Sequence, residues 1–184
     1  MYNGNECFVT GSKPLDLSLS DFWERICFNM QRSELRSMLA EFLVISSLEN
    51  MGVGTCVKRC DSPYCDVITN SGYVAIIKSA AYTDSEYGDR PDCISFQILP
   101  SENMKMGVYV FCLYKGMTEN DTPLNLDLWE FYIVPSQVIS QKISNRKSIT
   151  LPALMDLDPI LSDFYGIGEA INTSMELLNE IERI

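Results

Sequence analysis

Three side chains of this sequence have the types and the spacing to act on one ligand: the carboxylates of Asp66 and Glu41 and the ammonium group of Lys78. Asp66 begins one apolar segment, and Lys78 ends the next one after a turn at residues 70–72. Carboxylate oxygens are the ligands that Mg²⁺ prefers, and a lysine that leaves water at the end of an apolar strand requires a partner. Spacing alone leaves three interpretations open: an ion pair with Asp66, a lysine that reaches solvent at the strand end, or a catalytic pair. The sequence contains no histidine, which excludes histidine triads and histidine metal ligands.

A helix must position Glu41. Residues 33–50 carry apolar side chains mostly at three- and four-residue steps, which predicts an amphipathic helix capped by Ser33. The predicted buried stripe consists of Leu35, Met38, Leu39, Phe42, Ile45 and Leu48. Glu41 falls at the edge of this stripe, near Met38 and Ile45 rather than on the solvent side.

A hairpin must position Asp66 and Lys78. Residues 65–69 and 73–79 predict its two strands, and period-two alternation puts Ile76 and Lys78 on the same face. Residues 107–114 are almost continuously apolar, which predicts a central strand covered on both faces. Further strands are predicted at 55–59, 93–99 and 129–134, and helical segments at 136–140 and 161–183. A helix, then strands, then a helical tail predict a mixed α/β or α+β sheet with helices on its faces.

The first residues follow a different pattern. Residues 1–16 show no periodicity, which predicts a loop or a loosely docked arm. Ser18 and Asp21 have the spacing of a capping box and predict the start of a helix. The expected apolar side of that helix consists of Phe22, Trp23, Ile26 and Cys27.

These segments together resemble one bacterial branch of the restriction-endonuclease-like (PD-(D/E)xK) superfamily. The resemblance covers residues 22–157 and is carried in order by Arg36-x-x-Leu39-Ala40-Glu41, Asp66, Lys78-Ser79-Ala80-Ala81-Tyr82, and the stretches 108–111 and 123–132. It implies an α/β fold with a mixed central sheet flanked by helices, αβββαβ in outline. It also implies Mg²⁺- or Mn²⁺-dependent hydrolysis of DNA phosphodiesters. By motif, Asp66 and Glu41 would hold the metal ion, and Lys78 would position the attacking hydroxide.

The sequence departs from this pattern at one position. The acid expected two residues before Lys78 is Ile76, which has no lone pair to offer a metal ion. Two alternatives follow: an endodeoxyribonuclease with a degenerate, weakened site, or an inactive nuclease-fold binding subunit of a restriction or defence complex. Asp61 and Asp84 lie in neighbouring loops and are candidates to replace the missing acid.

Other polar side chains near these motifs have a functional and a structural interpretation. Gln97 is either a contact to phosphate or to a metal-bound water, or a polar residue on a half-covered sheet. Tyr82 either touches a phosphate or packs against its loop. Arg36 either contacts phosphate or pairs with a helix acid. Trp129, together with Phe131 and Tyr132, invites base stacking, but core packing is favoured in an apolar strand.

Composition bounds the partners and the organisation of the chain. With 184 residues it is expected to form one domain: an arm (1–16), a nuclease-like core (17–157) and a C-terminal helical extension (158–184). The net charge of −11 argues against tight non-specific DNA binding, although DNA and a protein both remain candidate partners. A homodimer is compatible with the sequence, and no apolar run is long enough to span a membrane.

Seven cysteines and no export signal predict a reducing, cytoplasmic location. Cys56, Cys60 and Cys65 have no standard zinc spacing, so small buried apolar side chains are the favoured interpretation over a structural metal.

Overall fold

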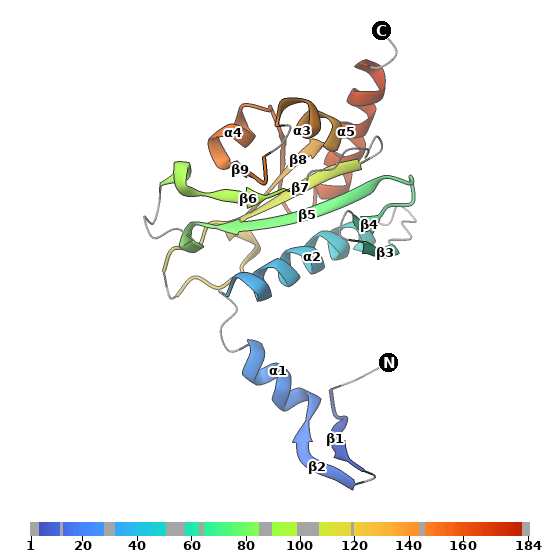
Figure 1. Cartoon of the computed structure of the whole chain (residues 1–184), viewed down its shortest axis with the longest axis vertical. Coiled ribbons are helices and arrows are strands. Elements are labelled where there is room, and N and C mark those ends of the chain that lie inside the picture. Colours follow the sequence, from blue (N-terminus) through green and yellow to red (C-terminus); the bar gives the residue numbers. More distant parts are fainter. Residues whose placement is uncertain are drawn as a thin grey trace.

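The computed structural model describes residues 4–11, 13–27, 32–50, 58–62, 65–84, 90–98, 107–118, 120–143 and 146–181 (Figure 1). Its strands are β1 (Cys7–Thr10), β2 (Lys13–Ser18), β3 (Lys58–Ser62), β4 (Cys65–Ile68), β5 (Val74–Ala81), β6 (Ser95–Gln97), β7 (Gly107–Tyr114), β8 (Trp129–Pro135), β9 (Ser148–Thr150) and β10 (Ile160–Ser162). Its α-helices are α1 (Leu19–Cys27), α2 (Ser33–Asn50), α3 (Ser136–Lys142), α4 (Leu151–Met155) and α5 (Ile167–Ile181). Short 3₁₀ turns are η1 (Tyr82–Asp84), η2 (Pro91–Cys93) and η3 (Leu126–Leu128). None of the helices in this part of the chain combines the length and the apolar content that crossing a bilayer requires.

A mixed sheet forms the centre of the protein. Among the described residues it has six strands in the order β10-β8-β7-β5-β4-β3. β5 and β7 run parallel in register from Val74 opposite Gly107 to Ala81 opposite Tyr114, whereas the other neighbouring strands are antiparallel. All residues of β7 are buried, which confirms the predicted central strand. The predicted mixed α/β class with helices on the sheet is therefore confirmed.

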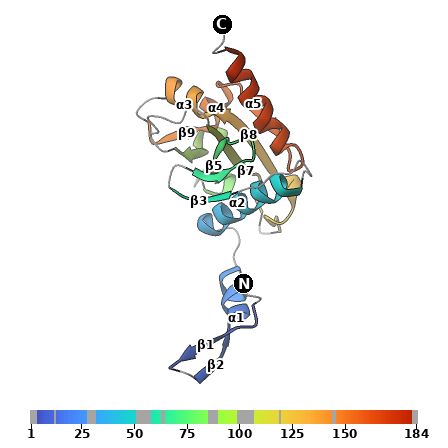
Figure 2. The ribbon, with the colours of Figure 1, turned by 90° about the vertical axis from the view of Figure 1, so that its right-hand side faces the viewer.

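Two layers cover this sheet, and the alternation along β5 separates them. Ala75 and Ile77 belong to the apolar cluster that includes α2 and α5, and we call this side the α2 face. Ile76 and Ala80 belong to the cluster that includes β6, β9, α3 and α4, and we call this side the α4 face. Figure 2 shows α2 and α5 on one side of the sheet and α3, α4 and β9 on the other. Successive β5 side chains thus enter different layers, as the pleat requires.

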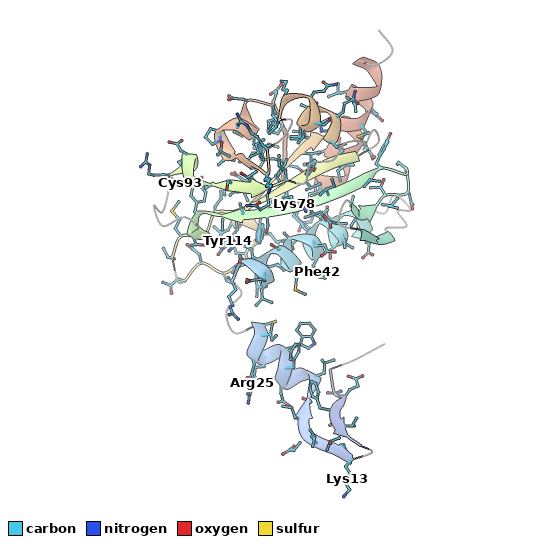
Figure 3. All side chains as sticks on the ribbon, viewed as in Figure 1. Lys13, Arg25, Phe42, Lys78, Cys93 and Tyr114 are labelled. Atoms are coloured by element: carbon cyan, nitrogen blue, oxygen red, sulfur yellow. The ribbon has the colours of Figure 1, made fainter. Side chains whose placement is uncertain are left out.

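The predicted buried stripe of α2 is confirmed in part, because Leu48 is buried and Leu39 and Ile45 pack against the α2-face core. Met38 is 53% exposed and Phe42 is 63% exposed, and Figure 3 shows Phe42 on the side of α2 away from β5. The buried side consists of Arg36, Ala40, Leu43, Val44, Ser47 and Leu48. Because this helix carries apolar residues on two sides, its periodicity leaves the orientation open, and the small Ala40 and Ser47 let it approach the sheet closely.

The connection from β5 to β7 differs from the outline that the resemblance implies. Its described part contains η1, η2 and β6 and no α-helix, while residues 85–89 and 99–106 lie outside the description. A strand was predicted at 93–99, and β6 forms there, but it pairs with β9 instead of joining the central sheet. The αβββαβ outline therefore stays an expectation.

The C-terminal region matches its helical prediction after a short strand. β10 pairs with β8 along residues 160–162, so the predicted helix begins only at Ile167. Ile171, Met175 and Leu178 are buried on the α2 face, as their spacing predicts.

The N-terminal region forms a small unit of its own. The sequence predicts a loop or a loosely docked arm over residues 1–16, and within the described residues β1 and β2 form a hairpin there instead of an irregular loop. The capping box is confirmed, because the Asp21 carboxylate accepts bonds from the N–H and the hydroxyl of Ser18 at 2.7 Å each. The predicted apolar side of α1 is not buried. β1, β2 and α1 lie apart from the central sheet (Figures 1 and 2). The predicted division into arm, core and extension stays a prediction.

Candidate functional site

Asp66 lies where β4 and β5 separate. The described pairing of these strands ends at Val67 opposite Ala75, and one further step would place Asp66 opposite Ile76. There Asp66 Oδ2 accepts a hydrogen bond of 2.6 Å from the backbone N–H of Ile77. The half-buried carboxylate thus replaces the backbone carbonyl that would otherwise accept this hydrogen bond in the sheet. The bond is charge-assisted and holds Asp66 against β5.

Ile76 and Lys78 both belong to the α4 face of β5. Ile76 is 0% exposed and packs in the cluster that contains Phe96 and Phe111. Lys78 lies between Ile76 and Ala80 on the same face and is half-buried (Figure 3). Among the described side chains no ion pair joins Lys78 to Asp66, so the simple ion-pair interpretation does not apply.

Glu41 is positioned by the way α2 crosses β5. The hydroxyl oxygens of Ser37 and Ser79 are 2.9 Å apart, which places the start of α2 against the end of β5. Leu48 and Thr69 line one cavity of about 430 Å³ between α2, the β4–β5 turn and α5, so α2 runs back toward the start of β5.

The level of Glu41 along β5 follows from these two anchors. The four helical residues from Ser37 to Glu41 span about 6 Å along the helix axis. Two strand residues, from Ser79 back to Ile77, span about the same length along β5. Glu41 therefore lies about one helical turn from the Ser37–Ser79 contact, in the direction of the start of β5. α2 belongs to the α2 face and Lys78 to the α4 face. The helix that carries Glu41 thus covers the face of the sheet opposite Lys78, and the predicted convergence of Glu41, Asp66 and Lys78 on one ligand stays a prediction.

Arg36 is a structural residue. It is 1% exposed, so it presents no surface to a phosphate. Burial raises the pKa of the Tyr114 phenol, and so does the charge of Asp121, whereas the nearby Arg36 guanidinium works in the opposite direction. Arg36 therefore lies near the end of β7.

The structure locates the remaining sequence candidates, and for Gln97 and Tyr82 both interpretations stay predictions. Gln97 is exposed on β6, outside the central sheet, while Tyr82 is half-buried against the α4-face cluster. Trp129, Phe131 and Tyr132 are buried, which confirms core packing over base stacking. The side chains of Asp61, Asp84, Cys56, Cys60 and Cys65 lie outside the described part of the structure.

One polar cluster was not anticipated from sequence. Glu130 accepts hydrogen bonds from Lys115 Nζ at 2.7 Å and from the Tyr132 hydroxyl at 2.5 Å. Burial opposes the charged form of Glu130, but these two bonds outweigh it and lower its pKa. Phe111 of β7 pairs with Lys78 on one side and with Tyr132 on the other, so these three residues share one face of the sheet. The cluster therefore lies on the α4 face, as Lys78 does. The alternation of Glu130 and Tyr132 is visible in the sequence, but the approach of Lys115 is not.

The residues present fit a divalent metal ion poorly. Of the two predicted carboxylate ligands, Asp66 already binds a backbone N–H, and Ile76 fills the third position with a packed aliphatic group. Mg²⁺ requires several converging oxygen ligands. Within the described residues no group of three or more acidic or cysteine side chains could hold a metal ion. We therefore derive no catalytic step through a metal here.

Comparison with known proteins adds no family: no protein-family description matches the chain, and no curated protein matches it significantly.

Proposed function

We propose that this chain is a restriction-endonuclease-like protein that has lost DNA hydrolysis and acts as a binding subunit. The observation that carries the proposal is Ile76. At the position where an active relative would place an acid, the side chain is 0% exposed and forms part of the α4-face core. An aliphatic group there supplies no ligand, and it excludes the water that a hydrolytic site must hold.

The nuclease-type fold is supported by the surroundings of Asp66. An acid lies where antiparallel strands separate, a lysine follows on the neighbouring strand, and the next sheet neighbour of that strand is parallel. Of these features, the mixed sheet and the placement of Asp66 and Lys78 on neighbouring strands agree with what the sequence resemblance implies for the core. The net charge of −11 favours a protein partner over non-specific contact with DNA phosphates.

A weak nuclease is the second candidate, and one observation favours it. Glu41 lies one helical turn after Ser37, whose hydroxyl oxygen is 2.9 Å from that of Ser79 on β5, and the Asp66 carboxylate binds the N–H of Ile77 two residues earlier on the same strand. α2 and β4 therefore each carry an acid near this part of β5.

A nuclease assay separates these two functions. The wild type is incubated with supercoiled plasmid and with single-stranded DNA in Mg²⁺ or Mn²⁺, beside Lys78→Ala and a control variant, Lys147→Ala, which changes an exposed lysine. We expect no cleavage by any of the three proteins. Cleavage by the wild type and Lys147→Ala that Lys78→Ala abolishes would overturn the proposal and establish the nuclease.

Binding is measured separately by fluorescence anisotropy with a labelled DNA duplex at low and at physiological salt. We expect little or no association at physiological salt, since the chain carries a strong negative charge. Tight, salt-resistant DNA binding by the uncleaving protein would show that the partner is DNA.

A further inference from the structure

The N-terminal unit, formed by β1, β2 and α1, exposes an unusual amount of apolar surface. None of its described residues is buried. Six of its large apolar side chains are 40–65% exposed: Phe8, Val9, Leu15, Leu17, Phe22 and Trp23. Glu6, Cys7, Phe8, Val9 and Leu19 line an apolar hollow of about 430 Å³ in this unit.

A unit of this kind needs a covering surface to stay ordered. A two-stranded hairpin is at best marginally stable in water, and so is an isolated helix shorter than about 12 residues. The capping box at Ser18 and Asp21 nevertheless stabilises the start of α1, so the local sequence favours an ordered helix. The missing stabilisation has to come from burial of its apolar side chains.

The same chain carries a second uncovered apolar surface on α2. Met38 and Phe42 lie one helical turn apart and are 53% and 63% exposed. Figure 3 shows Phe42 directed away from the sheet that the other side of α2 covers. Exposed apolar side chains so close together are typical of an interaction surface rather than of a solvated helix face.

We propose that two copies of this chain form a dimer by exchanging their N-terminal units, each unit covering Met38 and Phe42 on α2 of the other copy. The hollow beside Phe8 and Val9 is large enough to admit the Phe42 side chain. The exchange is reciprocal, as a two-fold dimer requires.

The available area agrees with a stable dimer. Taking about 200 Å² for a large apolar residue, the exposed fractions of the eight residues amount to about 800 Å² in each copy. Stable protein interfaces of ordinary size bury about 800 Å² from each partner. Either surface alone falls short of this value, so both have to take part.

The arrangement of the chain favours a second copy over the chain's own α2. In Figures 1 and 2 the N-terminal unit extends away from α2 and from the rest of the protein. In this conformation both apolar surfaces face solvent, and each is accessible to another copy.

A complementation experiment tests the exchange. Size-exclusion chromatography with light scattering is run over a concentration series on the full chain and on Trp23→Asp, Phe42→Asp and the control Leu124→Asp, whose apolar side chain is 63% exposed elsewhere. We expect the wild type and Leu124→Asp to dimerise. Trp23→Asp and Phe42→Asp are each expected to weaken the dimer at least tenfold.

The two weakened variants are then mixed in equal amounts. In the mixed dimer, the intact N-terminal unit of Phe42→Asp meets the intact α2 of Trp23→Asp, so one of the two contacts is restored. We expect dimer to reappear in the mixture at concentrations where each variant alone is monomeric. No recovery on mixing would overturn the exchange, and so would a wild type that stays monomeric, which would indicate docking on its own α2 or on another protein. Far-UV circular dichroism with thermal unfolding verifies that Phe42→Asp and Trp23→Asp remain folded.

Discussion

Replacing Ile76 by glutamate tests whether this position is the vacant third ligand of a nuclease-type site. Ile76 is 0% exposed, so the substitution removes about 1.5–3 kcal/mol of apolar burial. Burying a polar group without a partner costs about 1–3 kcal/mol more. We therefore expect Ile76→Glu to lower the free energy of unfolding by about 2.5–6 kcal/mol in EDTA. The matched control Ile76→Gln loses the same apolar burial and also buries a polar group without a partner, but its side chain carries no charge.

A metal ion should reverse much of this loss only in the glutamate variant. If the new carboxylate and Asp66 converge, Mn²⁺ at a hundred times its Kd adds about 2.7 kcal/mol. For a chain of this size, that corresponds to an increase in Tm of about 5–10 °C. Differential scanning fluorimetry of the wild type, Ile76→Glu and Ile76→Gln, with and without Mn²⁺, measures the difference.

The pH dependence in EDTA provides an internal check. Burial raises the pKa of the new carboxyl in the folded state above its unfolded value, so the folded state binds more protons between the two values. The stability of Ile76→Glu should therefore decrease as the pH rises above about 4.3, the usual glutamate pKa, until the raised folded pKa is passed. Ile76→Gln should not show this additional decrease. If Mn²⁺ gives both variants the same increase in Tm, Ile76 does not occupy a ligand position and the argument from Asp66 fails.

Three further predictions concern individual contacts. Asp66→Ala removes the acceptor of a backbone N–H bonded at 2.6 Å and should lower the free energy of unfolding by about 1–3 kcal/mol in urea denaturation, so a loss below about 0.5 kcal/mol would contradict that bond. Gly116→Ala should lower Tm measurably, because its Cβ would lie 2.1 Å from the hydroxyl of Tyr114, whereas an unchanged Tm would show that the ring moves freely. The hydroxyl and N–H of Ser18 lower the pKa of Asp21, so the contribution of Asp21 to helix stability should be complete above the usual aspartate pKa and lost as the pH falls through the lowered value. An NMR pH titration that finds the Asp21 pKa at or above its usual value would exclude this interaction.

Elements with one unambiguous pattern were predictable from sequence. β7 is apolar at nearly every position and is buried throughout, because a strand between two neighbours with both faces covered has no polar side. The capping box formed as predicted, since Ser18 and Asp21 are three residues apart and need only the helix itself. The hairpin that carries Asp66 and Lys78 also follows from local signals.

Other features depended on which surface each element met. α2 has apolar residues on two sides, so only the sheet decided that Ala40 is buried and Phe42 is exposed. β6 has strand character, but it pairs with β9, which is more than fifty residues away in the sequence. Local sequence patterns do not indicate which distant strand a segment pairs with. Lys115 and Glu130 likewise meet only because β7 and β8 run side by side.

For the candidate site, the order of the amino acids was enough to identify the chemical groups: an acid, a lysine two residues beyond an isoleucine, and an acid on a helix. The tertiary structure decided their arrangement. It turned Asp66 toward the N–H of Ile77, buried Ile76 in the core, and placed the helix that carries Glu41 on the face of the sheet opposite Lys78. The physical reason is that side-chain direction along a strand alternates locally, whereas the layer that each face meets is chosen by the packing of the whole chain.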